Sequence, residues 1–141
     1  MPNTRFAVAL HILTLLAVKR EEALTSEYIA GSVQTNAVVI RRLLSRLREA
    51  GLVRAVQGPG GGFAIAADPG DLTLRDVYEA VEERGLLLVH DEGNRQCPVG
   101  RNIGSILESV TADAEKAMLN SLAERTIASL ARKVNRLEKT G

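Results

Sequence analysis

The sequence from Asn36 to Val53, NAVVIRRLLSRLREAGLV, carries the strongest structural signal in this chain of 141 residues. Asn36 is a favoured N-cap and Gly51 stands where a helix terminator is expected, which predicts a helix over residues 37–50. At about 100° per residue, one side collects Ile40, Leu43, Leu44 and Leu47. The other side presents Val38, Arg41, Arg42 and Ser45. We therefore expect this helix to bury one face and to offer a cationic face to a partner.

A shorter helix comes before it. Thr25 or Ser26 is a suitable N-cap for a helix through Ala30, with Gly31 near its end. Residues 33–35, Val-Gln-Thr, are predicted to form a turn. A short helix, a tight turn and a longer amphipathic helix make a helix-turn-helix, whose second helix can lie in a major groove of DNA.

A β-hairpin is predicted next. Residues 52–57 and 63–66 are strand candidates joined by Gly58-Pro59-Gly60-Gly61-Gly62. Glycine reaches φ values that other residues avoid, and proline fixes one φ angle, so this segment suits a hairpin loop. A phosphate-binding loop is excluded, because no Gly-Lys-Ser/Thr follows and no helix begins after the glycines. A helix-turn-helix followed by a hairpin is a winged helix.

The flanking segments are predicted to be helical. Residues 6–18 form a largely buried helix with His11 as a core residue, and Thr73 caps a short helix over 74–81. From about 103 to 137, apolar residues recur at three-, four- or five-residue steps, which predicts one helix of roughly 50 Å. An apolar stripe of that length needs a second chain, so we expect a homodimer. The alternative is a helix that folds back wholly on its own domain.

The expected fold class is mainly α with a small β-hairpin wing. A winged helix-turn-helix DNA-binding domain takes residues 1–81, a connecting and sensor loop takes 82–102, and a long dimerisation helix takes 103–141.

Charge is unevenly distributed along the chain, although the net charge is only +1. Residues 33–67 hold five arginines against one acidic residue, a local charge of +4. Residues 68–92 hold two arginines against eight acidic residues, a local charge of −6. A basic patch confined to one region is typical of a polyanion binder, the alternative being a solvated helix face.

Composition excludes several classes of function. The single cysteine excludes an internal disulfide framework and any site built from several thiolates of one chain. His90, with Asp91 and Glu92, adds too few soft ligands for a metal site. No apolar run is long enough to span a bilayer and no signal peptide is evident, which predicts a cytoplasmic protein with no membrane partner. Without a nucleophile–base pairing or a catalytic loop, no enzyme is expected.

The run from Asn36 to Val53, followed by Gly58-Pro59-Gly60-Gly61-Gly62-Phe63, resembles the bacterial IscR/NsrR/CymR family of regulators (the "Rrf-two" type). The resemblance covers nearly the whole chain, and the glycine-rich wing with its aromatic residue is its most specific part. It implies a dimeric winged-helix transcription factor, usually a repressor, with a long C-terminal dimerisation helix.

The resemblance does not extend to a cofactor. Well-studied members of that family hold a 2Fe–2S cluster on three cysteines before the long helix, whereas Cys97 stands alone here. We therefore do not carry over cluster-based sensing and expect no cofactor. The sequence Cys97-Pro98-Val99-Gly100 looks more like the cluster-free branch, some of whose members sense oxidants or sulfur metabolites.

The expected mode of binding to a double-stranded DNA operator follows from the helix and the wing. Residues 36–42 would enter the major groove while the loop 58–62 lies against the backbone or in the minor groove. Arg41 and Arg42 are the candidates for base edges, because a guanidinium can grip O6 and N7 of guanine. Thr35 and Val38 would meet a phosphate and a thymine methyl group. The operator is expected to be an imperfect palindrome.

Other residues are expected at the edges of the interface. Arg46 and Arg48 are either phosphate contacts or plain surface charges. Gln57 stands where the family often carries arginine, so it weakens the grip of the wing or reads a base through its amide. The resemblance places Thr4 and Arg5 near the DNA backbone. The complete expected set of DNA-binding residues is Thr4, Arg5, Thr35, Asn36, Val38, Arg41, Arg42, Arg46, Gln57, Gly58, Gly60 and Gly61.

A redox-sensing role is the hypothesis for Cys97. It precedes Pro98, a residue favoured in the first turn of a helix, and lies between Arg95 and Arg101. A low pKa and reaction with oxidants would follow, giving a sulfenic acid, a mixed disulfide or a bridge to Cys97 of the partner subunit. The alternative is an inert, partly buried thiol. An oxidant or a small molecule is thus the expected kind of effector.

The competing hypothesis for the whole chain is a winged-helix protein–protein interaction module without specific DNA binding. The arginine-rich face argues against it, because a module that binds protein needs no stripe of cations.

Overall fold

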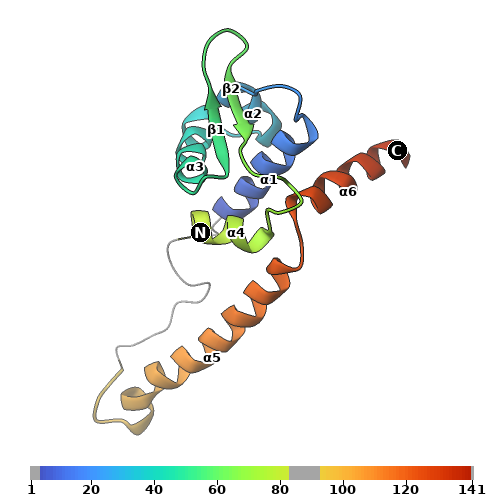
Figure 1. Ribbon diagram of the computed structural model, residues 1–141. Helices are drawn as coiled ribbons and strands as arrows, with labels where there is room; N and C mark the ends of the chain where they lie inside the picture. The colour runs from blue at the N-terminus through green and yellow to red at the C-terminus, as the bar shows by residue number, and fades with distance from the viewer. Residues whose placement is uncertain (1–3, 83–92, 141) are drawn as a thin grey trace.

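The structure is a computed structural model that describes residues 4–82 and 93–140. In chain order its elements are α1 (Arg5–Val18), α2 (Ser26–Val33), α3 (Ala37–Glu49), β1 (Val53–Val56), β2 (Gly62–Ile65), α4 (Leu74–Val81), α5 (Pro98–Ala123) and α6 (Ile127–Thr140). Helices α1 to α4 and the hairpin form one body, from which α5 projects as an arm, while α6 returns to pack against α1 (Figure 1). No helix in the described ranges is long and apolar enough to cross a lipid bilayer.

The helix-turn-helix forms because side chains satisfy the first backbone amides of both helices. Thr25 Oγ1 accepts a hydrogen bond from the backbone N–H of Tyr28 at 3.1 Å, and Asn36 Oδ1 accepts from that of Val39 at 3.0 Å. Gln34 makes the turn between the helices in the left-handed conformation, with φ of 63°. The structure confirms the predicted N-cap of α3 and resolves the choice for α2 in favour of Thr25.

The wing is a two-stranded antiparallel sheet in which Val53 pairs with Ile65 and Val56 pairs with Gly62. Its loop turns through Gly58 and Gly60, whose φ angles of 84° and 74° are readily accessible only to glycine. The segment before α2 extends this sheet. The backbone N–H of Leu24 donates to the Phe63 carbonyl at 2.9 Å, and the Phe63 N–H donates to the Leu24 carbonyl at 2.7 Å. Strand β2 of the wing is therefore fixed to the segment that leads into the helix-turn-helix.

The core of the body is aliphatic, as the scarcity of aromatic residues predicts. Its fully buried large side chains are Ile12, Leu13, Leu16, Ile29, Ile40, Leu44, Leu47, Leu72, Val77, Val81 and Ile127. Helix α4 begins at the predicted Thr73, which forms a reciprocal capping box with Asp76. Burial of the predicted inner face of α3 leaves its arginine-bearing face exposed.

The C-terminal region differs from the single helix predicted over 103–137. Two helices occupy it, separated by residues 124–126. Thr126 and Ser129 exchange side-chain and backbone hydrogen bonds at 3.2 Å, so a new helix starts there. Ile127 is fully buried, and its N–H donates to the Leu72 carbonyl at 2.9 Å. The break exists because Ile127 anchors the chain in the core, which sends α6 back onto its own domain.

The part of the predicted C-terminal helix that lies before the break belongs to α5, which forms the projecting arm. Helix α5 begins at Pro98, so the last residues of the predicted 82–102 loop are helical. None of its 26 residues is buried. At 1.5 Å per residue it is about 39 Å long.

Candidate nucleic-acid interface

The outer face of α3 carries the candidate base-reading side chains. Val38, Arg41, Arg42 and Ser45 are all exposed, as the helical periodicity predicts. No hydrogen bond or ion pair joins the side chain of Arg42 to another residue within the described ranges. An apolar side chain beside two guanidiniums on one exposed helical face suits the edges of base pairs, which offer both methyl groups and acceptors.

Arg41 is restrained by α2. Its Nη1 donates to Glu27 Oε1 at 3.5 Å and to Ser26 Oγ at 3.4 Å. The side chains of Arg41 and Glu27 are 51% and 71% exposed, and ion pairs this exposed contribute only about 0.2–1 kcal/mol. Arg41 can therefore leave Glu27 at small cost, but a carboxylate stands next to the candidate interface.

The turn before α3 contributes two further expected residues. Asn36 is exposed and uses its side-chain oxygen as the cap of α3, so its amide N–H groups are the donors it can offer. Thr35 is half-buried, and its backbone N–H donates to the Ala30 carbonyl at 3.1 Å. Both residues lie at the N-terminal end of α3, where backbone amides favour an anion such as a phosphate.

The tip of the wing is exposed at Gln57, Gly58 and Gly60. Gly61 is half-buried, and a Cβ there would collide with the backbone carbonyl oxygens of Val56 and Gly58. The glycines therefore give a loop that is narrow and has a backbone open to close approach.

Arg5 and Arg46 have partners inside the protein. Nη1 of Arg5 donates to the backbone carbonyl of Val81 at 3.1 Å, and Nη1 of Arg46 donates to the same oxygen at 3.0 Å. Arg46 is half-buried, so it is not the plain surface charge that was one of its two expected roles. Thr4 is exposed just before α1, and Arg48 is exposed in the last turn of α3.

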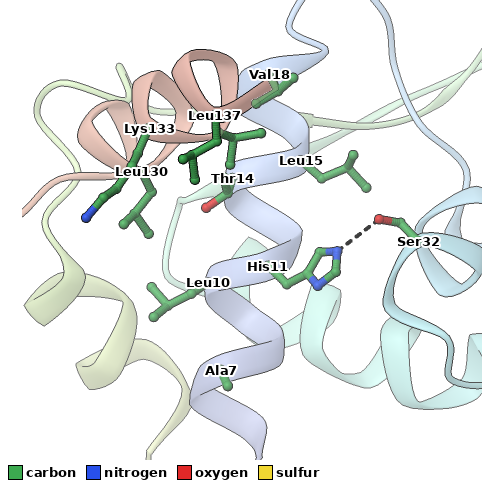
Figure 2. Close-up of a pocket in the computed structure, with 11 residues that line it drawn as sticks. Ala7, Leu10, His11, Thr14, Leu15, Val18, Ser32, Leu130, Lys133 and Leu137 are labelled. Atoms are coloured by element: carbon green, nitrogen blue, oxygen red, sulfur yellow. Dashed lines mark hydrogen bonds between the residues drawn. The ribbon is translucent and has the colours of Figure 1, made fainter. Parts of the chain in front are cut away.

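His11 is exposed rather than buried in the core, contrary to the sequence prediction. One ring nitrogen, Nε2, lies 2.9 Å from Ser32 Oγ on α2. Figure 2 shows this pair at the edge of an open apolar groove of about 530 Å³, between α1 and side chains of α6 such as Leu130. The prediction failed because a helix that is apolar on most sides gives little sign of which side its polar residue faces.

Cys97 is exposed and forms the N-cap position of α5. The backbone N–H of Gly100 and, to a smaller extent, that of Val99 lower the pKa of the Cys97 thiol, because they stabilise the thiolate. The lowering comes from these amides rather than from the two flanking arginines. The guanidinium of Arg101 instead donates to the carbonyl of Arg95 at 2.9 Å. The exposure of Cys97 also differs from the partly buried thiol of the alternative hypothesis.

No group of three or more His, Cys, Asp or Glu side chains is gathered anywhere in the described part of the chain. The candidate ligands His90, Asp91 and Glu92 lie outside the described residues.

Solved structures of regulators share this architecture. The chain superposes on a transcriptional regulator from Lactobacillus plantarum with a TM-score of 0.78 and 25% identity, over 94% of this chain and 90% of that one. It superposes on CymR, the global cysteine regulator of B. subtilis, with a TM-score of 0.71 and 22% identity, over 94% of this chain and 97% of that one. The second likeness establishes the fold alone.

Sequence comparison gives the family. YwnA of Bacillus subtilis (strain 168), named as an HTH-type transcriptional regulator, is 40% identical over 128 residues, which span 90% of this chain and 94% of YwnA. Residues 2–133 match the Rrf2 family, described as iron-dependent transcriptional regulators. The chain belongs to the Rrf2 family of transcriptional regulators.

Proposed function

We propose that this regulator binds a palindromic DNA operator as a homodimer and represses transcription from it. The observation that carries the proposal is the outer face of α3, where Val38, Arg41 and Arg42 stand exposed beside a glycine-rich wing. Rrf2 regulators bind DNA and are typically dimeric, which supports DNA binding and the homodimer. A protein that occupies an operator would work in the bacterial cytoplasm.

The chemistry of each side chain on and before α3 decides whether it is assigned to a base or to a phosphate. Arg42, and Arg41 once it leaves Glu27, would grip guanine, and each good bidentate contact discriminates by about 1–3 kcal/mol. Val38 would meet a thymine methyl group. Phosphates would be held by Thr35 and Asn36 at the N-terminal end of α3.

Contacts outside the major groove are assigned to the wing and to the start of the chain. Gln57 and the backbone at Gly58, Gly60 and Gly61 would lie against the DNA backbone or the minor groove. Thr4 would approach a phosphate. These contacts hold the register of the protein on the duplex, whereas α3 supplies the sequence preference.

Dimerisation is assigned to α5. The large apolar side chains Val99, Ile106 and Val110 of this arm are each more than half exposed. Helix α5 extends away from its own body (Figure 1), and no other element in the described ranges covers these side chains, which makes them suitable for contact with a second copy of the chain. A twofold arrangement of two such arms would place two α3 helices at a fixed distance.

A redox response through Cys97 is the proposed signal. The thiolate would attack a peroxide oxygen to give a sulfenic acid and release hydroxide. A second thiol, either a small molecule or Cys97 of the partner subunit, would then form a disulfide and release water. Exposure and the pKa lowered by the amides of α5 support this assignment. Replacing Cys97 with Ser should abolish release of DNA under peroxide or hypochlorite, and unchanged release would remove the role.

Iron, which the family description names, does not fit the residues of this chain. A cluster held by three thiolates of one chain needs three cysteines, and the sequence has one. The described residues also gather no alternative set of ligands. We therefore assign this protein no iron–sulfur cluster of the three-thiolate kind.

The proposal is tested by fluorescence anisotropy on a duplex selected by the protein from a random pool. Arg42→Ala and Arg41→Ala should each weaken binding to that duplex far more than binding to a scrambled one. Arg132→Ala on α6 removes the same charge from a helix that packs on α1 rather than in the helix-turn-helix, and it should change neither affinity. Equal affinity of the wild type for all duplexes would favour the protein-interaction module instead.

A further inference from the structure

A single backbone carbonyl at the end of α4 receives two arginines. Val81 is the last residue of α4 and is fully buried. Its oxygen accepts from Arg5 at the start of α1 and from Arg46 on α3, at 3.1 and 3.0 Å. Three helices that are distant in sequence therefore meet at one atom.

The chemistry of a helix end explains why this contact is strong. The last carbonyl oxygens of a helix have no partner within the helix and carry the negative end of its dipole, so cations stabilise them. Hydrogen bonds from a charged donor are about twice as strong as neutral ones. Both arginines are half-buried, which reduces competition from water.

A second contact supports the α1 side of this junction. Phe6, next to Arg5, packs edge-on against Tyr78 of α4, with ring centroids 5.4 Å apart. Tyr78 lies one turn before Val81. Helix α1 is thus held to the end of α4 by the ring of Phe6 and by the guanidinium of Arg5.

On the α3 side, the contact between Arg46 and the Val81 carbonyl lies close to the exposed face of α3 that carries Val38, Arg41 and Arg42, here called the reading face. Arg46 is one helical turn beyond Arg42, so a rotation of α3 that releases Arg46 also turns Arg42. Leu43 and Leu47 are buried beneath. These apolar contacts hold α3 to the core, and the hydrogen bond of Arg46 adds a directional contact to them.

Helix α4 also contacts the dimerisation arm. It packs against α5, and the N–H of Leu74 donates to the Arg125 carbonyl just beyond the end of α5, at 2.9 Å. Burial raises the pKa of Tyr78 most, and the charge of Glu115 on α5 raises it further. One short helix therefore connects the arm to the recognition helix.

We propose that Arg46 and Arg5 are positioning residues that clasp the Val81 carbonyl, and that this clasp sets the orientation of α3 relative to α4 and α5. The proposal rests on the proposed DNA-binding function and gives both arginines a role other than phosphate contact. A displacement of α5 would therefore alter the orientation of the reading face of α3 through the contacts at the Val81 carbonyl oxygen.

The two roles leave different signatures in DNA binding. A phosphate contact contributes to every duplex and to the salt dependence, so its loss lowers all affinities alike and reduces the slope of log affinity against log salt by about 1 per half-site, or about 2 for the homodimer. A positioning residue instead affects the fit of α3 to its own operator. Its loss lowers the ratio of selected to scrambled affinity and leaves the slope unchanged.

Arg46→Gln and Arg46→Lys test this in the full-length chain, with Arg48→Gln as the control on the same helix. Lysine keeps the charge but is shorter and lacks the Nη1 N–H that donates to the Val81 carbonyl. We expect both Arg46 variants to lower the selected-to-scrambled ratio by about tenfold, and Arg48→Gln to leave the ratio unchanged. A uniform loss with a smaller salt slope for Arg46→Gln, retained binding for Arg46→Lys, or no effect at all would overturn the proposal.

A second measurement needs no DNA and separates this proposal from the proposed function. Amide hydrogen exchange of the unliganded protein should speed up in α1, α3 and the last turn of α4 for Arg46→Gln and for Arg5→Gln alike. If Arg46→Gln does not fold, Arg46→Lys takes its place in this measurement. Faster exchange confined to the helix that carries the substitution would overturn the clasp. A wild type without duplex preference would refute DNA reading but leave this result standing.

Discussion

Replacing Glu27 with Gln should tighten DNA binding, because Glu27 would compete with DNA for the guanidinium of Arg41 if Arg41 contacts the bases as proposed. The two side chains meet at 3.5 Å, and both are more than half exposed. An ion pair of this kind contributes about 0.2–1 kcal/mol, so its removal should improve the affinity of one half-site by about 1.4- to fivefold. Two half-sites in a homodimer would give about two- to thirtyfold.

The measurement is a titration of a labelled duplex, selected by the wild type, at two salt concentrations. Glu79→Gln is the matched control, since Glu79 pairs with Arg75 at 2.8 Å on the exposed side of α4. It removes the same charge from a similar ion pair outside the helix-turn-helix and should change the affinity little. In an Arg41→Ala background, the gain from Glu27→Gln should shrink to the small effect of removing a negative charge near DNA. Unchanged or weaker binding by Glu27→Gln alone, or an equal gain from the control, would refute the placement of Arg41 at the bases.

Three further expectations concern reactivity and stability. Alkylation of Cys97 should rise with pH around a midpoint below that of an ordinary thiol, because the amide of Gly100 favours the thiolate; a midpoint near 8.5, as in the unfolded chain, would contradict the geometry. Tyr78→Phe should leave the unfolding free energy unchanged or raise it, since the buried hydroxyl has no hydrogen-bond partner among the described residues, and a loss above about 1 kcal/mol in a denaturant titration would show a missed partner. Ile127→Ala should cost about 2–5 kcal/mol in the same titration, and a smaller loss would mean that Ile127 does not anchor α6.

The helix-turn-helix was predictable because its signals are local. Asn36 at the cap, Gly51 after the last turn and four aliphatic residues at helical spacing define α3 without reference to the rest of the chain. The same holds for Thr73 and α4. Once the buried face of α3 was predicted, the helical periodicity placed the arginines on the opposite, exposed face.

The C-terminal half was harder to predict because its signals are tertiary. Leu122 and Ile127 are separated by a five-residue step, which the prediction bridged with one helix, whereas the contact between Ile127 and the core breaks the helix there. The cap formed by Thr126 and Ser129 was a second local clue, beside that five-residue step. The partner of Arg46 was hidden for a related reason, since its acceptor is a backbone carbonyl 35 residues away, which no side-chain pattern reveals.

Sequencing the duplexes that the purified full-length chain selects from a random pool tests most directly whether two α3 helices read one operator. We predict an inverted repeat with half-site centres about one helical turn of DNA, or a multiple of it, apart. A single unrepeated motif, or no enrichment over the starting pool, would contradict that account.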